Sequence, residues 1–297
     1  MKIDNYSLDS SQVFFNQVKT SLIDPLAINL SNHVEWWEIN NKKLSQPYKY
    51  PVAVIGEGSP LLLLHGFDSC FLEFRRLVPE LILNHKILIP DMFGFGFCPR
   101  PPNANYGKDA ILLHLSNILD LIQGSQPIGV IGASMGGAIA MEVARMHPDR
   151  IDKLMLLSPA GLTGKQQKVP PLIDQMGVWF LSRPFVRRGL CKQAFANPKD
   201  DVGEKEEQIA SIHLGVPGWK ESLASFAREG GLSNCGLPIP PQLFKVIWGS
   251  KDRILKGKVK EETYQLLGSY IEEIEECGHL PHIDKPKIVA EKWLTKK

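Results

Sequence analysis

The chain has no marked excess of either charge and no block of basic residues. Its 297 residues include 34 Lys and Arg against 32 Asp and Glu, a formal net charge of +2. The most basic short stretch, residues 256–260, is followed directly by Glu261 and Glu262, as in the solvated start of a helix. Proteins that bind nucleic acid usually carry a basic patch or stripe, so we expect no nucleic-acid partner.

Cysteine is scarce, and its positions form no pattern. The five cysteines are odd in number and include no Cys-x-x-Cys pair: Cys70, Cys98, Cys191, Cys235 and Cys277. Disulfide frameworks and structural zinc sites need paired or regularly spaced cysteines, so we expect neither. Scattered cysteines are typical of a reducing compartment, and we expect a cytoplasmic protein.

The chain also lacks a long hydrophobic run and an N-terminal targeting signal. Residues 121–141 contain no charge, but Gln123, Gly124 and Pro127 interrupt them, whereas a membrane span needs about 20 predominantly apolar residues. Residues 1–19 hold acidic side chains and no long apolar core, unlike a secretory signal or an Arg-rich transit peptide. We therefore expect no integral membrane segment.

What the chain does contain is an alternation of apolar runs and amphipathic segments. Its 43% hydrophobic and 22% charged residues are typical of a globular chain long enough for one large domain, or for a domain with an insertion. Two strands, at 33–40 and 50–58, are predicted to enter a sheet as an antiparallel pair joined by a polar connection. Before them, a helical stripe is predicted to pack on the core, formed by Val13, Phe14, Val18, Leu22 and Ile23.

Continuous apolar runs bounded by turn residues predict strands that are buried on both faces of a sheet. Such runs lie at 60–67, 85–91, 128–131, 153–160 and 244–252. Helical spacing at 71–83 and 109–122 separates the first three. Strand, helix, strand units imply parallel crossover connections. The sequence therefore predicts a doubly wound, mostly parallel α/β sheet.

Between Ala160 and Leu243 the pattern becomes helical, with segments around 171–195, 204–213 and 218–228. We therefore divide the chain into a core, 1–160 and 244–297, and a helical insertion, 161–243. Most aromatic residues of the insertion are expected to form its own small core. The rest are candidates to contact a substrate at the seam with the sheet, where ligand sites commonly lie. These candidates are Trp179, Phe180 and Trp219.

The central feature is the turn Gly132-Ala133-Ser134-Met135-Gly136, between an apolar strand and an Ala-rich helix. A serine at such a turn must adopt a strained backbone conformation, and the flanking glycines remove Cβ atoms that would block the close strand-to-helix approach. Ser134 also lies at the N-terminus of the helix, where free N–H groups stabilise an anion. The pattern is typical of a nucleophile elbow.

Five motifs together resemble the α/β-hydrolase family, in the branch with a helical cap inserted after the sixth strand. They are His65-Gly66-Phe67, residues 90–96, residues 132–137, residues 248–252 and residues 277–282, and the match runs from about residue 33 to the C-terminus. The resemblance implies the α/β-hydrolase fold, with residues 161–243 as the cap. It also implies a catalytic triad in the order Ser, Asp or Glu, His, which Ser134, Asp252 and His279 follow.

Each of these residue types suits its role. A serine hydroxyl needs an adjacent base, for which histidine titrates in the right range, and a carboxylate fixes the imidazole tautomer. His282 competes with His279, but the family motif has the base directly after a glycine, here Gly278. Three other acids compete with Asp252, namely Asp149, Asp152 and Asp284.

The resemblance further implies an oxyanion hole made by the backbone N–H groups of Phe67 and Met135, with His65 holding the loop by hydrogen bonds. No cofactor is expected, because a dinucleotide fingerprint fails at Pro99 and no P-loop lysine accompanies the elbow glycines. No metal is expected either, because the two histidines at 279 and 282 lack helical i, i+4 spacing and a third ligand.

We therefore expect a serine hydrolase that acts on a small molecule with a hydrophobic portion, most simply a carboxylic ester, through an acyl-enzyme. A C–C bond hydrolase, a cofactor-free lyase or an acyltransferase on the same triad remains open, as does a non-catalytic binding protein. Family members that cleave C–C bonds usually carry Asn before the serine and a Gly-rich loop after His-Gly, where this chain has Ala133 and residues 67–70. Epoxide hydrolases and dehalogenases of the same fold use Asp at the elbow. Because this chain has Ser134 at that position, we expect neither activity.

Overall fold

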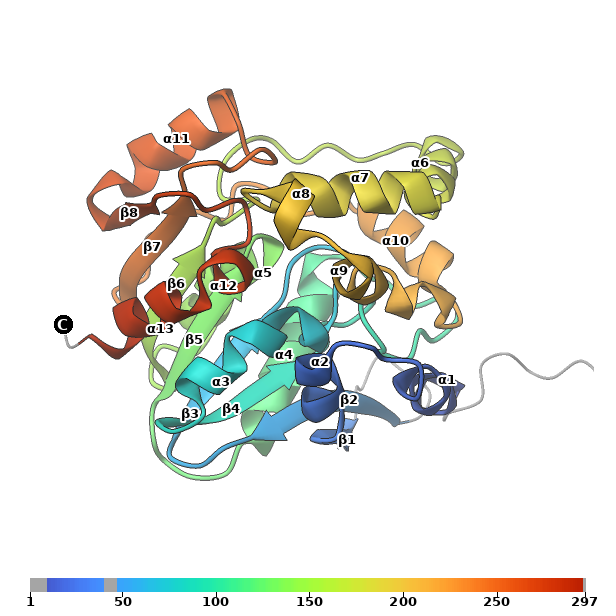
Figure 1. The fold of residues 1–297 in the computed structure, drawn as a ribbon, viewed down its shortest axis with the longest axis horizontal. Helices are drawn as coiled ribbons and strands as arrows, with labels where there is room; N and C mark the ends of the chain where they lie inside the picture. The colour runs from blue at the N-terminus through green and yellow to red at the C-terminus, as the bar shows by residue number, and fades with distance from the viewer. Residues whose placement is uncertain (1–9, 40–46, 296–297) are drawn as a thin grey trace, which may run out of the picture.

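The computed structural model describes residues 10–39 and 47–295, which fold around one twisted sheet (Figure 1). Its eight strands lie in the order β1-β2-β4-β3-β5-β6-β7-β8. The first two are the predicted antiparallel pair, β2 also runs antiparallel to β4, and all other neighbours are parallel. The strands are β1 (Val34–Ile39), β2 (Tyr48–Ile55), β3 (Ser59–Leu64), β4 (His85–Pro90), β5 (Ile128–Ala133), β6 (Ile151–Leu157), β7 (Leu243–Gly249) and β8 (Ile271–Ile274).

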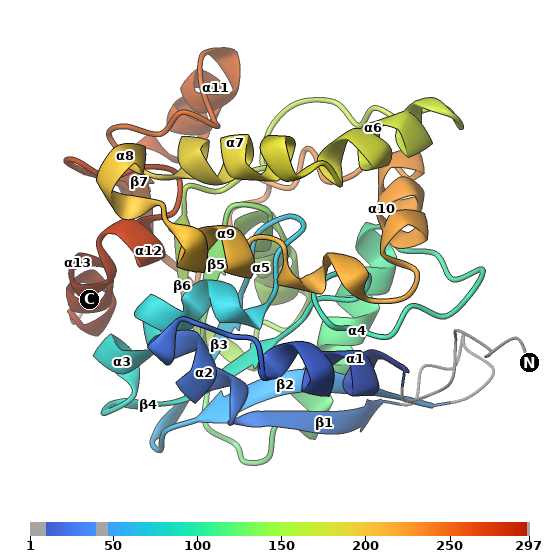
Figure 2. The ribbon, with the colours of Figure 1, turned by 45° about the vertical axis from the view of Figure 1, so that its right-hand side comes forward.

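Helices cover both faces of the sheet (Figures 1 and 2). Alternate side chains of a strand point to opposite faces, so Leu62 and Leu64 of β3 enter one core while Leu61 and Leu63 enter the other. The first core packs on α4 (Lys108–Leu121), α5 (Met135–Met146) and α11 (Lys258–Leu267). The second packs on α1 (Ser10–Lys19), α2 (Pro25–Ser31), α3 (Val78–Leu81) and α13 (Pro286–Leu294).

The chain between β6 and β7 forms helices and no strand, as the sequence predicts. We call this part the helical segment. It lies together on one side of the molecule, across one edge of the sheet (Figures 1 and 2). The division of the chain at residues 160/161 and 243/244 into core and cap stays a prediction. The helices are α6 (Ile173–Leu181), α7 (Pro184–Ala194), α8 (Pro198–Asp201), α9 (Glu204–Ile209), the 3-10 turn η2 (Ile212–Gly215) and α10 (Trp219–Arg228).

Two predictions for the part of the chain before β4 are wrong in detail. Residues 71–83 are not one helix but a 3-10 turn, η1 (Phe71–Arg76), followed by α3, because Pro79 cannot donate the backbone hydrogen bond that a continuous helix needs. The N-terminal stripe packs on the core only in part. Leu22 is buried and Phe14 and Val18 pack against the core as expected, but Val13 and Ile23 are 52% and 40% exposed, and Phe15 is buried in addition.

Some short elements carry no clear signal in the sequence. The short edge strand β8 and the short α2, α8 and α12 (Pro281–Asp284) were not predicted, because four to seven residues show too little periodicity. The polar connection predicted between the first two strands lies outside the described residues. In the described part of the chain, no helix is long and apolar enough to cross a membrane.

Candidate active site

Ser134 lies at the sharp turn between β5 and α5. Its φ of 50° and ψ of −116° are unusual for a residue with a side chain and strain the backbone. A Cβ atom on Gly132 would meet the backbone of Gly136, and one on Gly136 would meet the carbonyl of Leu64. The turn is therefore closed on both sides by backbone, which explains why glycine is needed before and after the serine.

The structure brings together the three side chains that the sequence predicts as a triad. His279 Nε2 lies 2.9 Å from Ser134 Oγ, and His279 Nδ1 lies 2.9 Å from Asp252 Oδ2. These residues come from loops after three different strands, β5, β7 and β8, which end at the same edge of the parallel sheet. Their catalytic role stays a prediction.

Hydrogen bonds fix the orientation of the Asp252 and His279 side chains. The other oxygen of Asp252, Oδ1, accepts the backbone N–H groups of Ile254 and Leu255 at 2.8 and 3.0 Å. Burial by itself would raise the pKa of Asp252, but the hydrogen bond and charge of His279, together with these two N–H groups, hold it below its usual value. An ionised carboxylate selects the imidazole tautomer with the proton on Nδ1, so Nε2 is free to accept the serine proton.

The loop after β3 passes directly beside Ser134. A methyl group added to Gly66 would lie 3.6 Å from Ser134 Cβ, and the Gly66 N–H donates to the buried Glu73 carboxylate at 3.2 Å. His65 holds the same loop, as expected. It accepts the Met92 N–H on Nε2 at 3.0 Å, so its Nδ1–H donates to the Gly66 carbonyl at 2.8 Å. Burial lowers the pKa of His65, which favours this neutral form.

The predicted oxyanion donors flank Ser134 in sequence and space. Met135 follows Ser134, and Phe67 follows Gly66, the residue beside Ser134. Within residues 10–39 and 47–295, no backbone hydrogen bond is formed by the N–H of Phe67 or of Met135. If Ser134 is a nucleophile, two neighbouring N–H donors that no protein group occupies suit the negative charge that would develop there.

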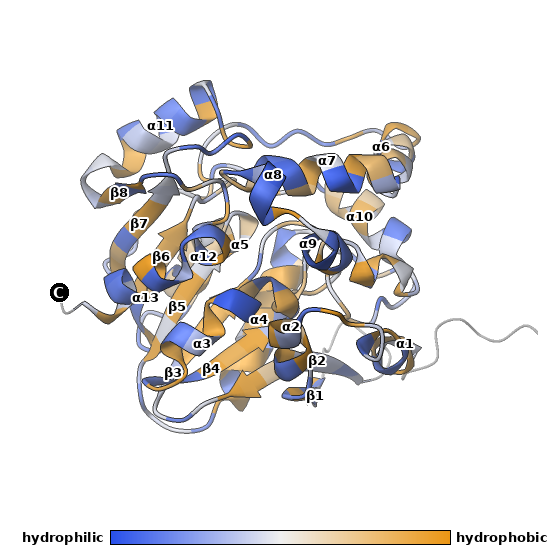
Figure 3. Ribbon diagram, viewed as in Figure 1, coloured by the Kyte–Doolittle hydropathy of each residue, from blue (hydrophilic) through white to orange (hydrophobic). Residues whose placement is uncertain are grey.

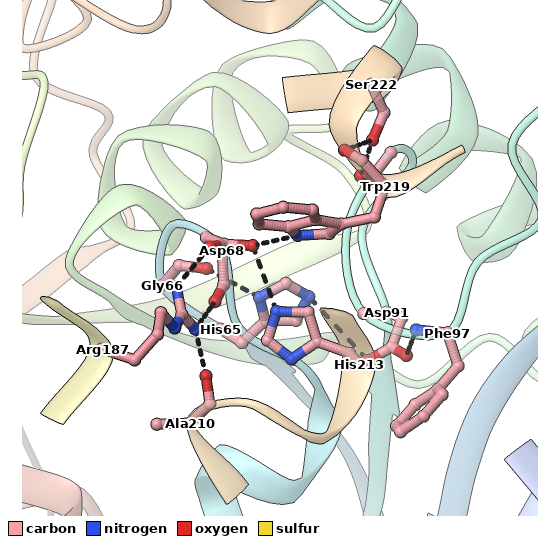
Figure 4. Close-up of polar contacts among 12 residues, drawn as sticks. His65, Gly66, Asp68, Asp91, Phe97, Arg187, Ala210, His213, Trp219 and Ser222 are labelled. Carbon is pink, nitrogen blue, oxygen red and sulfur yellow. Dashed lines mark hydrogen bonds and ion pairs between the residues drawn. The ribbon is translucent and has the colours of Figure 1, made fainter. Parts of the chain in front are cut away.

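A buried carboxylate next in the same loop joins the sheet to the helical segment (Figure 4). Asp68 accepts hydrogen bonds from three side chains: Trp219 Nε1 at 2.8 Å, His213 Nε2 at 3.1 Å and Arg187 Nη1. Burial alone would raise the pKa of Asp68, but the hydrogen bond and charge of His213 and the charge of Arg187 lower it. The sequence analysis missed this cluster, because its other three members lie 119–151 residues after Asp68 along the chain.

The aromatic residues predicted to contact a substrate lie in different environments. Trp179 and Phe180 of α6 are 55% and 50% exposed, whereas Trp219 is 3% exposed and bound to Asp68. An unpredicted aromatic cluster lies beside the loop after β3. The ring of Phe67 is 5.8 Å from Phe95 and 5.7 Å from Phe226 of α10, and it remains 44% exposed. The third residue of the His-Gly-Phe motif is the sequence signal that could have pointed to it.

The competing groups occupy other places. His282 is fully buried, with Nε2 3.1 Å from Glu73 Oε1. Asp284 accepts the Gly278 and Ala196 N–H groups, and Asp149 and Asp152 are exposed.

The two cysteines near the site are buried free thiols. Burial raises the pKa of Cys277 to about 12 and that of Cys70 above its usual value, so neither is a reactive thiolate. The described residues contain no group of three or more His, Cys, Asp or Glu that could hold a metal ion.

Comparison with known proteins gives consistent results. A family model for the α/β hydrolase fold matches residues 59–206. A 2-hydroxymuconate semialdehyde hydrolase from Pseudomonas sp. (strain CF600) is 28% identical over 249 residues, which cover 77% of this chain and 83% of the relative. Lipase 1 of Psychrobacter immobilis is 28% identical over 242 residues, 76% of this chain and 73% of the relative. A solved meta-cleavage product hydrolase from Pseudomonas fluorescens IP01 has a TM-score of 0.69 at 22% identity, covering 88% of this chain and 98% of that one.

Proposed function

Since this chain belongs to the α/β-hydrolase fold family, we propose that it is a serine hydrolase that cleaves carboxylic esters through an acyl-enzyme. The observation that carries the proposal is the continuous hydrogen-bonded series Asp252–His279–Ser134, with both distances at 2.9 Å. Such a series lets histidine act as base and then as acid at one position.

In the proposed reaction, Ser134 Oγ attacks the ester carbonyl carbon while its proton moves to His279 Nε2. Asp252 stabilises the imidazolium, and the N–H groups of Phe67 and Met135 stabilise the oxyanion of the tetrahedral intermediate. The intermediate collapses as His279 returns the proton to the departing alcohol. A water molecule that gives its proton to His279 then attacks the acyl-serine, which releases the acid and restores Ser134.

The proposed substrate has a hydrophobic portion. Phe67 carries a proposed oxyanion donor in its backbone, and its half-exposed ring packs edge-on against Phe95 and beside Phe226 of the helical segment. An apolar acyl or alcohol group near the reacting carbonyl would bury part of this surface, which is favourable by about 25 cal/mol per Å² of apolar area. Residues 161–243 would then act as the cap over the site.

A second candidate is hydrolysis of a C–C bond in a diketone-like compound. It is favoured by the similarity to the 2-hydroxymuconate semialdehyde hydrolase. The residues around the nucleophile support the ester more strongly, because the position before Ser134 is Ala133 and the loop after His65-Gly66 is not rich in glycine. A lyase, an acyltransferase and a non-catalytic binding protein on the same scaffold would keep the same geometry.

The first test is labelling of the purified protein with a fluorophosphonate, followed by intact mass measurement and peptide mapping. We expect one label on Ser134, none on Ser134→Ala and slow labelling of His279→Ala. A folded protein that takes no label would contradict an activated serine and favour the binding protein.

Turnover then separates the reactions. We expect hydrolysis of p-nitrophenyl esters with kcat/KM that rises with acyl chain length. Turnover of 2-hydroxy-6-oxo-2,4-heptadienoate without turnover of any ester would favour the C–C bond hydrolase instead. Incorporation of ¹⁸O from labelled water into the released acid distinguishes hydrolysis from transfer to another acceptor.

A further inference from the structure

Glu73 is a buried carboxylate that no step of the proposed reaction uses. It lies in η1, the turn that follows the loop after β3, and only 5% of it is exposed. Figure 3 shows β3 and β5, the strands that lead to Gly66 and to Ser134, as apolar ribbons. An ionised group in such surroundings must find its partners within the protein, so the partners of Glu73 indicate what it does.

Both carboxylate oxygens of Glu73 face the loop after β3. The Gly66 nitrogen lies 3.2 Å from Oε1 and 3.3 Å from Oε2 and donates its hydrogen to them. The Ser69 hydroxyl also forms a hydrogen bond with this carboxylate. Because these two donors stand before and after residues 67–68, one side chain holds both ends of the short loop.

The same carboxylate contacts α12, the helix that follows the predicted base His279. His282 of α12 is fully buried, with Nε2 3.1 Å from Glu73 Oε1 and its ring centre 4.8 Å from that of Phe74. Burial by itself would raise the pKa of Glu73, but the contact with His282 and the hydrogen bond from Ser69 hold it below its usual value. Glu73 is therefore an anion, which only accepts hydrogen bonds.

The position of Gly66 decides where the Phe67 N–H points. A methyl group on Gly66 would lie 3.3 Å from Glu73 Oε2 and 3.6 Å from Ser134 Cβ, so Gly66 is held between these two side chains. The Gly66 carbonyl accepts the Nδ1–H of His65 at 2.8 Å (Figure 4). In a trans peptide the next N–H points away from the carbonyl. The direction of the Phe67 N–H is therefore fixed once both polar groups of Gly66 are bound.

The loop needs such support because its backbone is strained. Asp68 has a φ of 48°, which is uncommon for a residue with a side chain, and a strained conformation persists only where its surroundings fix it. The Asp68 side chain binds the helical segment, whereas Glu73 supplies the hydrogen bonds that hold the loop to η1.

We propose that Glu73 is a positioning residue, whose carboxylate holds Gly66 so that the Phe67 N–H meets the oxyanion formed at Ser134. This inference rests on the proposed function, because the donor that Glu73 places works in the transition state of that reaction. Loss of such a donor lowers kcat rather than raising KM, and a displacement of about 1 Å can cost about 10²-fold in rate. A carboxylate that served only the stability of the fold would not produce this pattern.

Two substitutions separate the reach of the side chain from its charge. Glu73→Gln removes the charge but keeps the length and an oxygen that can accept the Gly66 N–H. Its NH₂ group can donate to His282 Nε2, since a histidine without an anionic partner is neutral at pH 8. Glu73→Asp keeps the charge, but its carboxylate is withdrawn by one C–C bond, about 1.5 Å, and no longer reaches the Gly66 N–H.

The assay is steady-state hydrolysis of a short p-nitrophenyl ester at pH 8. We expect Glu73→Gln to retain at least about half of kcat, and Glu73→Asp to lower kcat at least about tenfold with KM within about twofold. A trifluoromethyl ketone forms a tetrahedral adduct with an oxyanion, so its affinity should fall in parallel with kcat/KM. Retained kcat in Glu73→Asp, or a loss above about tenfold in folded Glu73→Gln, would each overturn the proposal.

Glu206 of α9 provides the matched control. It is also a buried carboxylate, 7% exposed, and it binds the same turn η1 through Arg75 and Arg76 at 3.2 and 2.6 Å. In the described part of the chain none of its hydrogen bonds reaches the loop after β3. Glu206→Asp should lower the stability to urea and leave kcat within about twofold. An equal loss of kcat would show that any disturbance of η1 slows the reaction, and would overturn a specific role for Glu73.

The rate of fluorophosphonate labelling distinguishes a failure of this proposal from a failure of the proposed function. An unaltered protein that takes no label at Ser134 would overturn both. Equal labelling rates in the unaltered protein and in Glu73→Asp would overturn the role of Glu73 alone, because the phosphonyl oxygen uses the same N–H donors. We expect Glu73→Asp to be labelled at least about tenfold more slowly and Glu73→Gln at close to the unaltered rate.

Discussion

Asp68 offers a direct test of how the helical segment is attached to the loop beside Ser134, the proposed nucleophile. Its carboxylate faces Arg187, which is only 8% exposed, and it accepts hydrogen bonds from His213 and Trp219, which are buried. Asp68→Asn keeps Oδ1, the atom that accepts from His213 and Trp219, but puts an NH₂ group opposite the guanidinium. A buried cation is then left without its anion.

The expected cost follows from that burial. Removing one partner of a buried ion pair typically destabilises a protein by about 3–5 kcal/mol. We expect Asp68→Asn to lie near the lower limit, about 3 kcal/mol, because two of the three hydrogen bonds survive. Asp68→Ala also loses those two bonds, each worth about 1 kcal/mol, and should cost about 2 kcal/mol more.

The assay is urea denaturation at pH 7 in a double-mutant cycle with Arg187→Met. Because the double variant Asp68→Asn/Arg187→Met buries no charge, it should recover about 2 kcal/mol relative to Asp68→Asn. The loop after β3 should also lose its fixed position in Asp68→Asn, so kcat on a short ester should fall. The double variant, which lacks the unpaired guanidinium, should recover part of this kcat. A cost below about 1 kcal/mol for Asp68→Asn, or free energies that simply add in the cycle, would refute a strongly coupled buried pair.

Three further substitutions test the site and the core. Asp252→Asn should lower kcat about 10⁴-fold with little change in KM, because the wrong imidazole tautomer faces Ser134; a loss below tenfold in steady-state kinetics would contradict this role. Phe67→Ala keeps the backbone donor but loses the ring contacts with Phe95 and Phe226, so the preference for long-chain over short-chain esters should shrink while fluorophosphonate still labels Ser134. Burial lowers the pKa of His114 to about 4, so the unfolded chain binds its proton first as pH falls. The stability that this neutral histidine contributes is present above pH 6.5 and is lost toward pH 4, by about 3 kcal/mol. His114→Gln should therefore show a shallower fall in urea stability between pH 6.5 and 4; an unchanged slope would argue against the shift.

Much of the fold could be predicted because its signals are local. Each buried strand of the parallel sheet is a short apolar run such as residues 60–64, and these runs alternate with helical spacing. Residues 71–83 show the limit of this reasoning, since apolar spacing favours a helix and Pro79 divides it. The edge strand β8 is only four residues long, IEEI, and carries no clear period.

The sequence alone determined the candidate nucleophile, base and acid, because Ser134, His279 and Asp252 each lie in a short contiguous motif that resembles a motif of the family. Only the tertiary structure decided which polar groups meet Asp68 and which aromatic side chains are buried. Trp179 and Trp219 both lie in helices of the same segment, yet one is 55% exposed and the other 3%. The reason is physical: the indole of Trp219 reaches a carboxylate 151 residues away in the chain. Such a contact depends on how helices pack on the sheet, which no local pattern encodes.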